Sequence, residues 1–363
     1  MKKALELAAR ARGMTSPNPL VGALLVKKGK IISEGYHRKA GTPHAEAIAI
    51  HLAGERASGA TLYVNLEPCC HKDKRTPPCT EKIISSGIGK VVTAMEDPNP
   101  KVSGKGIEEL KKAGIKVVSG VMEEKARELN QYYIKHITTG TPFVILKVAM
   151  TLDGKIATPE GESKWITGEK ARAMVHRLRG EVDALMTAIG TVKADNPRLT
   201  CRTGGDRSPA RIIIDPGLEV DKDACILSIP PPTILVTQKA PKGDTGHGRK
   251  KEEKKSSLLR KGISIVEYEG EKVDLTWLMR KLGAMGLVSL LIEGGSSLNA
   301  YCLEQGVVDK VMFFIAPKII GGRDSFSAVG GMSFRKLADA YRIKDTKIRR
   351  IGDDLLIEGY VQH

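Results

Sequence analysis

Two short stretches, "HAE" at residues 44–46 and "LEPCCHKDKRTPPCT" at residues 66–80, decide how the first part of this 363-residue chain is interpreted. The first stretch carries a histidine and a glutamate separated by one alanine, and the second carries three cysteines within eleven residues. Six cysteines in so long a chain do not form a disulfide framework, so this cluster favours a metal site in a reducing compartment. The scattered Cys201, Cys225 and Cys302 are expected to be small buried residues.

The residue types in these stretches suit hydrolysis at zinc. Such a site needs three protein ligands and an open position for water, whose pKa the metal lowers to about 7. A separate carboxylic acid must move the proton from the attacking water to the leaving group. His44 and Glu46, at the start of an expected helix, can supply one ligand and this shuttle. The other ligands must come from the cysteine stretch, and a purely structural site would use Cys70 or His71 as a fourth ligand.

Alternating strand and helix patterns over the first 120 residues predict a sheet with helices on its faces, which is an α/β fold. Strands are expected at residues 20–26, 31–36, 60–68, 90–97 and 116–120, with helices at 43–54, 79–89 and 106–115. A further helix is expected at 123–142, and a new series of strands begins at residue 143. We therefore place a boundary near residue 141 and expect domains at 1–141 and 142–363.

The second half alternates between strands and helices as well, and it contains no copy of the first-half motifs. Strands are expected at 143–150, 182–188, 211–215, 233–237, 263–268, 288–295 and 311–320, with helices at 169–180 and 273–285. In "VSLLIEGGSSLNAY" (288–301), a Gly-Gly turn before a helix would expose backbone N–H groups to a pyrophosphate. A Gly-Gly turn is weak evidence alone, and the absence of GxGxxG indicates a dinucleotide fold other than the Rossmann type.

The net charge of +16 is spread over the chain, with +9 in residues 1–141 and +7 in the remainder. Nucleic-acid-binding proteins usually concentrate positive charge on one face and add aromatic side chains, but only 4% of these residues are aromatic. A diffuse excess also suits anionic small molecules. No stretch approaches the roughly 20 apolar residues of a membrane span, and the N-terminus lacks the apolar core of a signal peptide. We expect a cytoplasmic protein that binds neither nucleic acid nor membrane.

Zinc-dependent nucleobase deaminases carry H-x-E followed by P-C-x-x-C. The first half of that signature is present, whereas the cysteine spacing differs. The segment "PCCHKDKRTPPC" (68–79) instead resembles that of the pyrimidine deaminases of riboflavin biosynthesis. This resemblance implies a cytidine-deaminase-like α/β/α layer fold for 1–141, zinc ligands at His44, Cys69 and Cys79, and Glu46 as the catalytic proton shuttle. Cys70 and the neighbouring histidine would line the site. The segment is one residue longer than is usual in the family, within "HKDKR" (71–75), and the effect of this insertion is left open.

Neighbouring segments extend the resemblance to the substrate site. "SPNPLVG" (16–22), "GYHRKAGTPHAE" (35–46) and "MEDPNPKVSGKG" (95–106) are similar to the family's substrate-contacting segments. They imply contacts to substrate from Asn18, His37, Asp97 and Asn99. The two asparagine amides can pair with a pyrimidine edge, and His37 with the basic loop can face a ribose phosphate.

Segments of the second half resemble the reductase domain of the same bifunctional enzymes, and deaminase followed by reductase is the order found in bacteria and plants. They are "LKVAMTLDGKIA", "GESKWITG", "AIGTVKADNPRLTCR", "RIIID" and "LLIEGGSSLNAY". The resemblance implies a dihydrofolate-reductase-like α/β fold that uses NADPH. The implied NADPH contacts are Ala149, Trp165, Thr191, Asp195, Gly295, Ser296, Ser297, Leu298, Asn299, Ala300 and Tyr301. The implied substrate contacts are Ser163, Arg179, Leu199, Arg202 and Glu293.

Two features of this reductase half stay open. Arg179 and Arg202 are candidate clamps for a substrate phosphate. Either Lys147 or Asp195 could donate the proton that accompanies hydride transfer, and the sequence does not choose between them.

These observations predict a bifunctional enzyme of riboflavin biosynthesis that binds a phosphorylated pyrimidine and forms a homo-oligomer. It would deaminate 2,5-diamino-6-(5-phosphoribosylamino)pyrimidin-4-one and then reduce the ribosyl group to ribityl. One alternative is a tRNA adenosine deaminase with an RNA-binding extension, which the cysteine spacing and the strand-rich second half oppose. The other is a non-catalytic, zinc-stabilised nucleotide-binding module, which Glu46 opposes because a structural site needs no proton shuttle.

Overall fold

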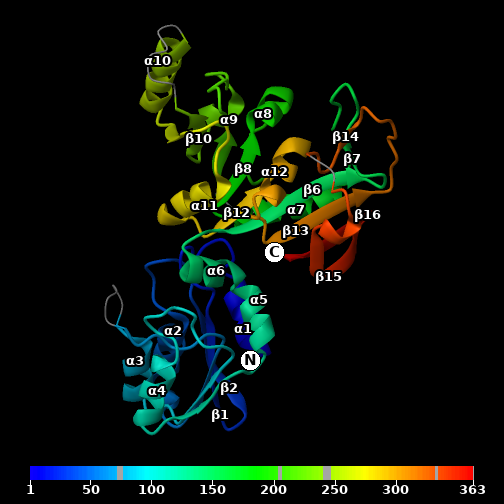
Figure 1. Ribbon diagram of the computed structural model, residues 1–363. Helices are drawn as coiled ribbons and strands as arrows, with labels where there is room; N and C mark the ends of the chain where they lie inside the picture. The colour runs from blue at the N-terminus through cyan, green and yellow to red at the C-terminus, as the bar shows by residue number, and fades with distance from the viewer. Residues whose placement is uncertain (72–76, 203–206, 240–246, 332–333, 363) are drawn as a thin grey trace. The chain divides into compact units, whose positions relative to one another are not determined.

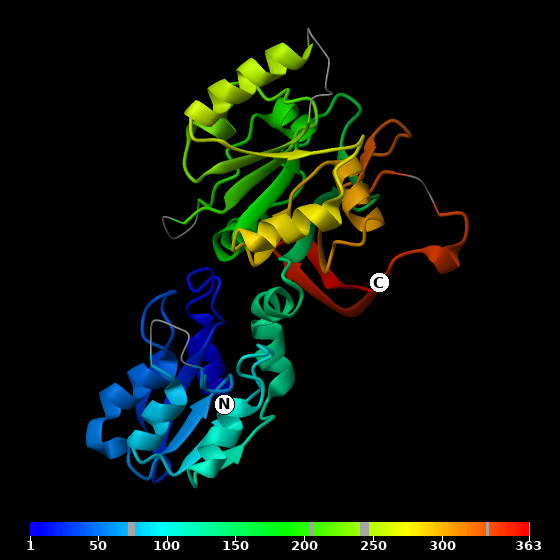
Figure 2. The same ribbon diagram turned by 60° about the vertical axis from the view of Figure 1, so that its left-hand side comes forward.

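The computed structural model describes residues 1–71, 77–202, 207–239, 247–331 and 334–362, and the chain separates into two compact units (Figures 1 and 2). Unit 1 comprises Met1–Thr141 with Gly283–Val288, and unit 2 comprises Pro142–Leu282 with Ser289–His363. Each unit is a mixed α/β structure, as the sequence predicts. No helix in the described ranges is both long and apolar enough to cross a membrane.

Unit 1 contains a five-stranded sheet with the strand order β2-β1-β3-β4-β5. Its strands are β1 (Gly22–Lys27), β2 (Lys30–Tyr36), β3 (Thr61–Val64), β4 (Lys90–Thr93) and β5 (Lys116–Val118). The strand β1 pairs antiparallel with β2 and β3, and β3, β4 and β5 run parallel. The helices are α1 (Lys2–Ala9), α2 (Ala45–Ala53), α3 (Cys79–Ser85), α4 (Lys105–Lys112), α5 (Glu123–Leu129) and α6 (Gln131–Thr139), with a 3-10 turn η1 (Gly54–Ala57).

The helices of unit 1 cover both faces of its sheet. One core cluster joins α2, α3 and α4 to the sheet, and two smaller clusters join α1, α5 and α6 to it. Two glycines allow this close packing. A Cβ atom on Gly22 would lie 2.2 Å from the carbonyl oxygen of Ala4 in α1, and one on Gly35 would lie 2.5 Å from that of Ala45 in α2. Because Gly35 pairs with Ala23, the residue after Gly22, these two helices pack on opposite faces.

The single helix expected at 123–142 is instead two helices, α5 and α6, and this part of the prediction was wrong. The break lies at Asn130, whose backbone leaves helical geometry (φ −101°, ψ 15°). Its side-chain Oδ1 accepts the Leu20 N–H at 2.8 Å, and its Nδ2 donates to the Leu20 carbonyl at 3.1 Å. The asparagine therefore joins the start of α6 to the segment that precedes β1, and such side-chain competition with the backbone is typical of asparagine.

Unit 2 contains a nine-stranded sheet with the strand order β11-β10-β9-β8-β12-β6-β13-β16-β15. Its strands are β6 (Phe143–Thr151), β8 (Ala184–Ala188), β9 (Ala210–Ile214), β10 (Thr233–Gln238), β11 (Ser264–Tyr268), β12 (Ser289–Ile292), β13 (Lys310–Ala316), β15 (Arg342–Ile351) and β16 (Asp354–Gln362). A small separate sheet pairs β7 (Lys155–Ala157) with β14 (Phe326–Ser327). The helices of this half are α7 (Glu169–Glu181), α8 (Ile189–Asp195), α9 (Cys225–Ser228), α10 (His247–Arg260), α11 (Leu275–Ala284) and α12 (Ser296–Glu304), with a 3-10 turn η2 (Leu337–Asp339).

The strands from β11 to β13 are parallel, and the hairpin of β15 and β16 adds antiparallel strands at one edge. The central strands β8 and β12 are almost wholly buried and apolar, as parallel strands covered on both faces are. In contrast, nine of the ten residues of the edge strand β15 are exposed. The sequence analysis did not predict this hairpin, although β16 carries an apolar run; in β15, charged and polar residues separate the isoleucines of "RIKDTKIRRI".

Candidate active sites

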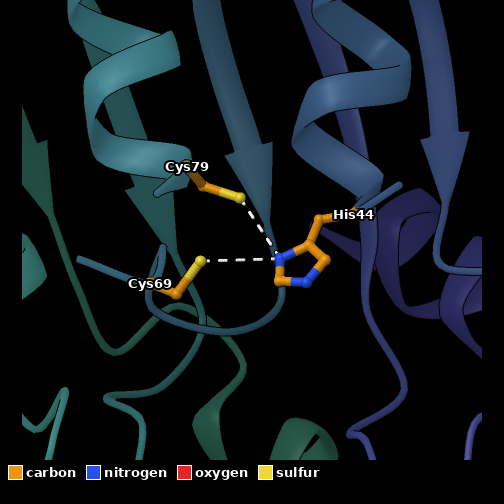
Figure 3. A group of neighbouring side chains, drawn as sticks. All are labelled: His44, Cys69 and Cys79. Atoms are coloured by element: carbon orange, nitrogen blue, oxygen red, sulfur yellow. Dashed lines mark hydrogen bonds between the residues drawn. The ribbon is translucent and has the colours of Figure 1, made fainter. Parts of the chain in front are cut away.

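The predicted zinc ligands lie together in unit 1, although they come from three parts of the fold. His44 caps the N-terminus of α2, Cys79 is the first residue of α3, and Cys69 lies in the segment after β3. The His44 Nδ1 atom lies 3.5 Å from the Cys69 sulfur and 3.3 Å from the Cys79 sulfur (Figure 3). Within the described ranges, these residues form the one group of at least three potential metal-binding side chains with donor atoms within 4.8 Å of one another.

Backbone hydrogen bonds bring the two cysteines together. The carbonyl oxygen of Cys69 accepts the N–H of Cys79 at 2.9 Å and that of Thr80 at 3.3 Å. These N–H groups belong to the first turn of α3, where no partner exists within the helix itself. The start of α3 is thus joined directly to the segment after β3. Residues 72–76, which contain most of the "HKDKR" stretch (71–75) in which the one extra residue falls, lie outside the described residues.

The donor set fits zinc. One imidazole nitrogen and two thiolates are ligands that zinc prefers, and three protein ligands leave a fourth position for water. Cys70 is half-buried and packs against the core cluster, and it is not part of the ligand group. His71 lies on the wall of the neighbouring cavity. This arrangement is typical of a catalytic zinc centre and not of a four-ligand structural site.

Glu46 lies in the first turn of α2 and is only 3% exposed. Its Oε2 atom is buried and has no hydrogen-bond partner among the described residues. Burial, followed by the negative charge of Cys69, raises the pKa of this carboxyl group. A buried carboxyl group with a raised pKa, close to a group of metal ligands, is suited to taking up and releasing a proton during a reaction.

A cavity of ≈ 760 Å³ opens beside these groups, and its wall includes His44, Cys69 and Glu46. The same wall contains all of the residues predicted to contact the pyrimidine substrate, namely Asn18, His37, Asp97 and Asn99. It also contains Tyr133 and His136 of α6, which the sequence analysis did not identify as site residues. Their spacing of three residues places them on one face of the helix, and this was the available signal.

His37 is 3% exposed and lies between two polar partners. Its Nδ1 lies 3.2 Å from the Pro43 carbonyl oxygen, and its Nε2 lies 3.1 Å from Nδ2 of Asn18. A carbonyl oxygen only accepts, so Nδ1 carries the proton and Nε2 accepts from the asparagine amide. Burial lowers the pKa of His37, which favours this neutral form. The imidazole therefore orients the Asn18 amide, and contact between His37 and a ribose phosphate stays a prediction.

Asp97 and Glu67 organise the opposite wall of the cavity. Asp97 is 5% exposed, and burial raises its pKa to about 6. The Glu67 carboxylate is also buried, and it accepts the backbone N–H groups of Asp97 (3.1 Å), Gly104 (2.9 Å) and Ile107 (3.1 Å). A single carboxylate thereby holds the segment 97–107, which carries Asp97 and Asn99, against the end of β3.

The second cavity lies in unit 2, has a volume of ≈ 930 Å³, and opens at the carboxyl ends of β6, β8 and β12. Ligands of open parallel sheets commonly bind at this edge. Most residues predicted to contact NADPH or substrate lie on its wall: Ala149, Ser163, Trp165, Arg179, Thr191, Asp195, Leu199, Arg202, Glu293, Gly295, Ser296, Ser297 and Leu298. The wall also contains Arg172 and His176 of α7, which the sequence analysis did not identify.

The remaining predicted NADPH residues lie farther along α12 and are not on the cavity wall. They are Asn299, Ala300 and Tyr301. The Asn299 amide donates to the Ala328 carbonyl at 2.8 Å, and the Tyr301 hydroxyl donates to the Val273 carbonyl at 2.8 Å. These side chains fasten α12 to neighbouring segments, while the start of the helix reaches the cavity.

A buried ion triad forms one wall of this cavity. The Arg179 guanidinium donates to both Glu293 oxygens, at 2.6 and 2.8 Å, and Lys147 Nζ lies 3.6 Å from Glu293 Oε2. Burial alone would raise the pKa of Glu293, but Arg179 and Lys147 outweigh it and lower the pKa to about 2. Burial lowers the pKa of Lys147. The predicted phosphate clamp Arg179 is thus engaged by a carboxylate, and Arg202 does not share that pairing.

Asp195, the other candidate proton donor, has a different environment. Its Oδ1 pairs with Lys164 Nζ at 3.0 Å, and both side chains are partly exposed at the cavity mouth. The neighbouring Trp165 is 61% exposed and lies beneath the Arg172 guanidinium, 4.7 Å from its centre. The side chains near the mouth are therefore polar and accessible, whereas those of the triad are buried.

Unit 1 carries one histidine and two cysteines beside a buried glutamate, which is the site of a zinc-dependent deaminase. Unit 2 is a separate α/β unit with a cavity large enough for a dinucleotide. The family model "Cytidine and deoxycytidylate deaminase zinc-binding region" matches residues 1–95, and the model "RibD C-terminal domain" matches residues 142–357. The chain belongs to the RibD family of riboflavin biosynthesis proteins. It is a bifunctional enzyme, a deaminase joined to a reductase, and its cofactors are zinc and NADPH.

The similarity extends over the whole chain. The riboflavin biosynthesis protein RibD of Aquifex aeolicus (strain VF5) is 45% identical over 359 residues, which cover 98% of this chain and 96% of that protein. The structure of Acinetobacter baumannii RibD, form 1, matches with a TM-score of 0.88 at 36% identity and covers 100% of this chain and 98% of that one. A Thermotoga maritima protein, described as a diaminohydroxyphosphoribosylaminopyrimidine deaminase/5-amino-6-(5-phosphoribosylamino)uracil reductase, matches with a TM-score of 0.85 at 36% identity over 100% of this chain and 97% of its own. These full-length matches favour the bifunctional enzyme over both alternatives.

The ligand assignment predicts different effects of two adjacent cysteines. Cys69→Ser should reduce bound zinc from about one ion per chain to near zero, because serine oxygen is a much poorer zinc ligand than thiolate. Cys70→Ser is the matched control and should retain zinc, because Cys70 lies outside the ligand group. Elemental analysis of each dialysed protein measures the difference. If Cys70→Ser lost zinc and Cys69→Ser retained it, the zinc ligand would be Cys70 and not Cys69.

The ion triad predicts an acid-sensitive stability of unit 2. The pKa of Glu293 is about 2 in the folded protein, below its ordinary value of 4.5. Its stabilising effect is therefore complete above pH 4.5 and is lost as the pH falls from 4.5 towards 2. Glu293→Gln should lower the free energy of unfolding at pH 7 by about 3 kcal/mol, because two buried cations lose their partner.

The control for this prediction is Glu269→Gln, which removes an exposed pair with Lys239. That change should cost less than about 1 kcal/mol. Denaturant unfolding followed by the fluorescence of Trp165 and Trp277, both in unit 2, measures both variants between pH 3 and 8. Equal stability of the two variants at pH 7 would contradict the proposed contribution of the triad.

Proposed function

We propose that residues 1–141 catalyse the hydrolytic deamination of 2,5-diamino-6-(5-phosphoribosylamino)pyrimidin-4-one, and that residues 142–363 reduce the ribosyl group of the product to ribityl. The observation that carries this proposal is the cluster of His44, Cys69 and Cys79 beside the buried Oε2 atom of Glu46, which has no hydrogen-bond partner among the residues that the structure describes. The reaction names of the Thermotoga maritima protein, which matches this chain over its full length, support the choice of substrate.

In the deamination, Glu46 carries the protons. Zinc, held by His44, Cys69 and Cys79, supplies the Lewis acidity that makes a water molecule acidic near neutral pH. Glu46 accepts the proton of the attacking water and passes it to the amino group that leaves as ammonia. Burial, followed by the negative charge of Cys69, raises the pKa of the Glu46 carboxyl group, which favours the protonated form that can pass a proton to the leaving group.

The cavity wall orients the pyrimidine during this step. Asn18, whose amide His37 fixes from behind, and Asn99 can exchange hydrogen bonds with the edge of the ring. Asp97 offers a carboxylate to an N–H group of the substrate. Because these groups come from three separate segments of unit 1, they surround a planar ring on several sides.

In the reduction, NADPH supplies the hydride and this chain supplies position and a proton. Opening of the ribose ring leaves an imine between C1′ and the amino nitrogen; hydride added at C1′ would give the CH2 group of the ribityl chain, and the imine nitrogen would take up a proton. We assign this proton to Lys147, because its buried ammonium lies beside Glu293, whereas Asp195 pairs with Lys164 at the mouth. The N–H groups after Gly294 and Gly295, at the start of α12, suit the pyrophosphate of the cofactor.

The substrate class also accounts for the positive charge of the chain. Both the phosphoribosyl group and NADPH are anionic, and Arg202 on the cavity wall can bind the substrate phosphate with the remaining N–H groups of Arg179. We propose that the protein acts in the cytoplasm and binds neither nucleic acid nor membrane. This proposal is supported by the even spread of charge between residues 1–141 and the remainder.

We further propose that a second copy of this chain covers the outer face of β15 and β16. Ile343, Ile348 and Leu355 are 37%, 66% and 39% exposed, and the strand register places them on one face of the hairpin. Apolar side chains gathered in this way are typical of an interface between protein chains. Ile348→Lys should therefore convert a dimer into monomers in light scattering after size exclusion. A wild-type protein that is already monomeric would contradict the proposal.

The experiment that tests the function gives zinc-loaded protein the phosphoribosylated diaminopyrimidinone and then NADPH. Ammonia release followed by NADPH oxidation is expected. Glu46→Gln should slow ammonia release at least about 100-fold, because a general acid–base group is lost. Its zinc content should be unchanged, and so should its oxidation of NADPH when the deaminated product is supplied.

The matched control is Glu55→Gln, which alters an exposed carboxylate of the same unit and should leave both activities unchanged. Full deamination by Glu46→Gln would remove Glu46 from the shuttle role. Absence of both activities in the wild-type enzyme would contradict the proposed substrate.

A further inference from the structure

The deaminase cavity contains a tyrosine to which the chemistry above assigns no role. Tyr133 of α6 is 8% exposed, and its side chain lies on the cavity wall with Asp97 and Asn99. Its hydroxyl group donates a buried hydrogen bond of 2.8 Å to Oδ1 of Asp97. The two residues are 36 positions apart in the sequence, so the contact joins α6 to the segment that follows β4.

This bond completes the hydrogen bonding of one carboxylate oxygen of Asp97. Oδ1 also accepts the backbone N–H of Asn99 at 2.9 Å, and the Asp97 backbone N–H donates to Glu67 at 3.1 Å. Two donors directed at Oδ1 fix the rotation of the carboxylate about its last torsion, which is otherwise broad. No hydrogen bond to Oδ2 is recorded in the described part of the chain, and Asp97 lies on the cavity wall, so we take Oδ2 as the oxygen available to the substrate.

We propose that Tyr133 is a positioning residue for substrate recognition by the deaminase. Its hydroxyl group holds the Asp97 carboxylate so that Oδ2 accepts an N–H group of the pyrimidine, while Asn99 is placed by the same turn. This proposal rests on the proposed function for the identity of the substrate. The contact between Tyr133 and Asp97 does not depend on that identity.

The surrounding charges explain why such a donor is needed. Burial raises the pKa of Asp97 to about 6, and the nearby negative charges of Glu67 and Cys69 raise it further, whereas the Asn99 N–H and the Tyr133 hydroxyl lower it. Removal of the hydroxyl would leave the buried carboxylate with one donor fewer. The pKa of Asp97 would rise, so its carboxylate would become protonated at a higher pH than in the wild type. Asp97 in its acid form would offer a proton where the substrate N–H requires an acceptor.

A purely structural tyrosine would behave differently. If the ring of Tyr133 only filled the core beneath the cavity, phenylalanine would replace it without consequence, because the ring would be retained. The proposal assigns the effect to the hydroxyl oxygen, so Tyr133→Phe separates the two roles. Tyr63→Phe is the matched control, because Tyr63 lies on β3 in the same unit, outside the cavity wall.

The first test compares zinc-loaded, full-length variants in deamination. Tyr133→Phe should lower kcat/KM about 10-fold, mainly through KM, since a hydrogen bond to a charged group is removed. The acid limb of its pH profile should move to higher pH, with zinc content and reductase activity unchanged. Tyr63→Phe should match the wild type. Values of kcat/KM within twofold of the wild type, together with an unmoved acid limb, would overturn the proposal.

A double-mutant cycle tests whether Tyr133 acts through Asp97. Asp97→Asn retains Oδ1 as an acceptor and abolishes the charge. In that background, adding Tyr133→Phe should change kcat/KM less than twofold, because the group through which Tyr133 acts is already altered. A further 10-fold loss would show that Tyr133 acts on something else and would overturn the proposal.

A third measurement separates this inference from the proposed function. The carboxyl carbon of Asp97, assigned by comparison with Asp97→Asn, can be followed by NMR against pH in the zinc-loaded protein without substrate. Its midpoint should rise in Tyr133→Phe and stay unchanged in Tyr63→Phe. A wild-type enzyme that fails to deaminate the pyrimidine would contradict the proposed function alone. An unchanged midpoint in Tyr133→Phe would contradict the role of Tyr133.

Discussion

The hydrogen bonds from the first turn of α3 to the carbonyl oxygen of Cys69 are the constraint on which the deaminase site depends. They join two ligands that are ten residues apart, and the close packing of α2 against Gly35 brings the helix that His44 caps to the same place. The glycine allows α2 to pack closely, the start of α2 presents His44, and the first turn of α3 presents Cys79 and binds the carbonyl oxygen of Cys69. The metal ligands are thus positioned by backbone contacts of the helices and segments that carry them.

Four buried carboxylates show how the same functional group is adapted to different tasks in this chain. Glu67 accepts three backbone N–H groups and serves as a structural link. Glu293 is neutralised by two cations, and its pKa falls to about 2. Asp97 receives two donors on one oxygen, and Glu46 retains an oxygen without a partner in the described ranges. The carboxylate that holds the fold accepts three backbone donors, whereas the one that exchanges protons keeps an oxygen without a donor in the described ranges, as their chemistry requires.

The sequence was informative where chemistry depends on residue type and local spacing, and less so where it depends on tertiary contact. The HAE motif and the cysteine segment predicted residues that the structure brings together, because ligand types are distinctive. Tyr133 gave no comparable signal, since an aromatic residue on a helix is ordinarily part of the core. The sequence also did not indicate that Asn299 lies off the cavity wall, because a sequence motif does not show which residues of a helix face a cavity. The break at Asn130 depends on Leu20, which is 110 residues away.

The reductase cavity gathers part of the positive charge of the chain, whose net charge is +16, on one concave surface. Six basic residues lie on the wall, and they are Lys147, Lys164, Arg172, Arg179, Arg198 and Arg202. Glu293 engages two of them and Asp195 engages a third, so two of the six positive charges are balanced within the site. The other three form no ion pair that the structure records among the described residues, and they lie around a concave surface of limited size. Positive charge placed in this way favours compact anions such as sugar phosphates and dinucleotides, whereas the phosphate spacing of a nucleic acid calls for an extended surface.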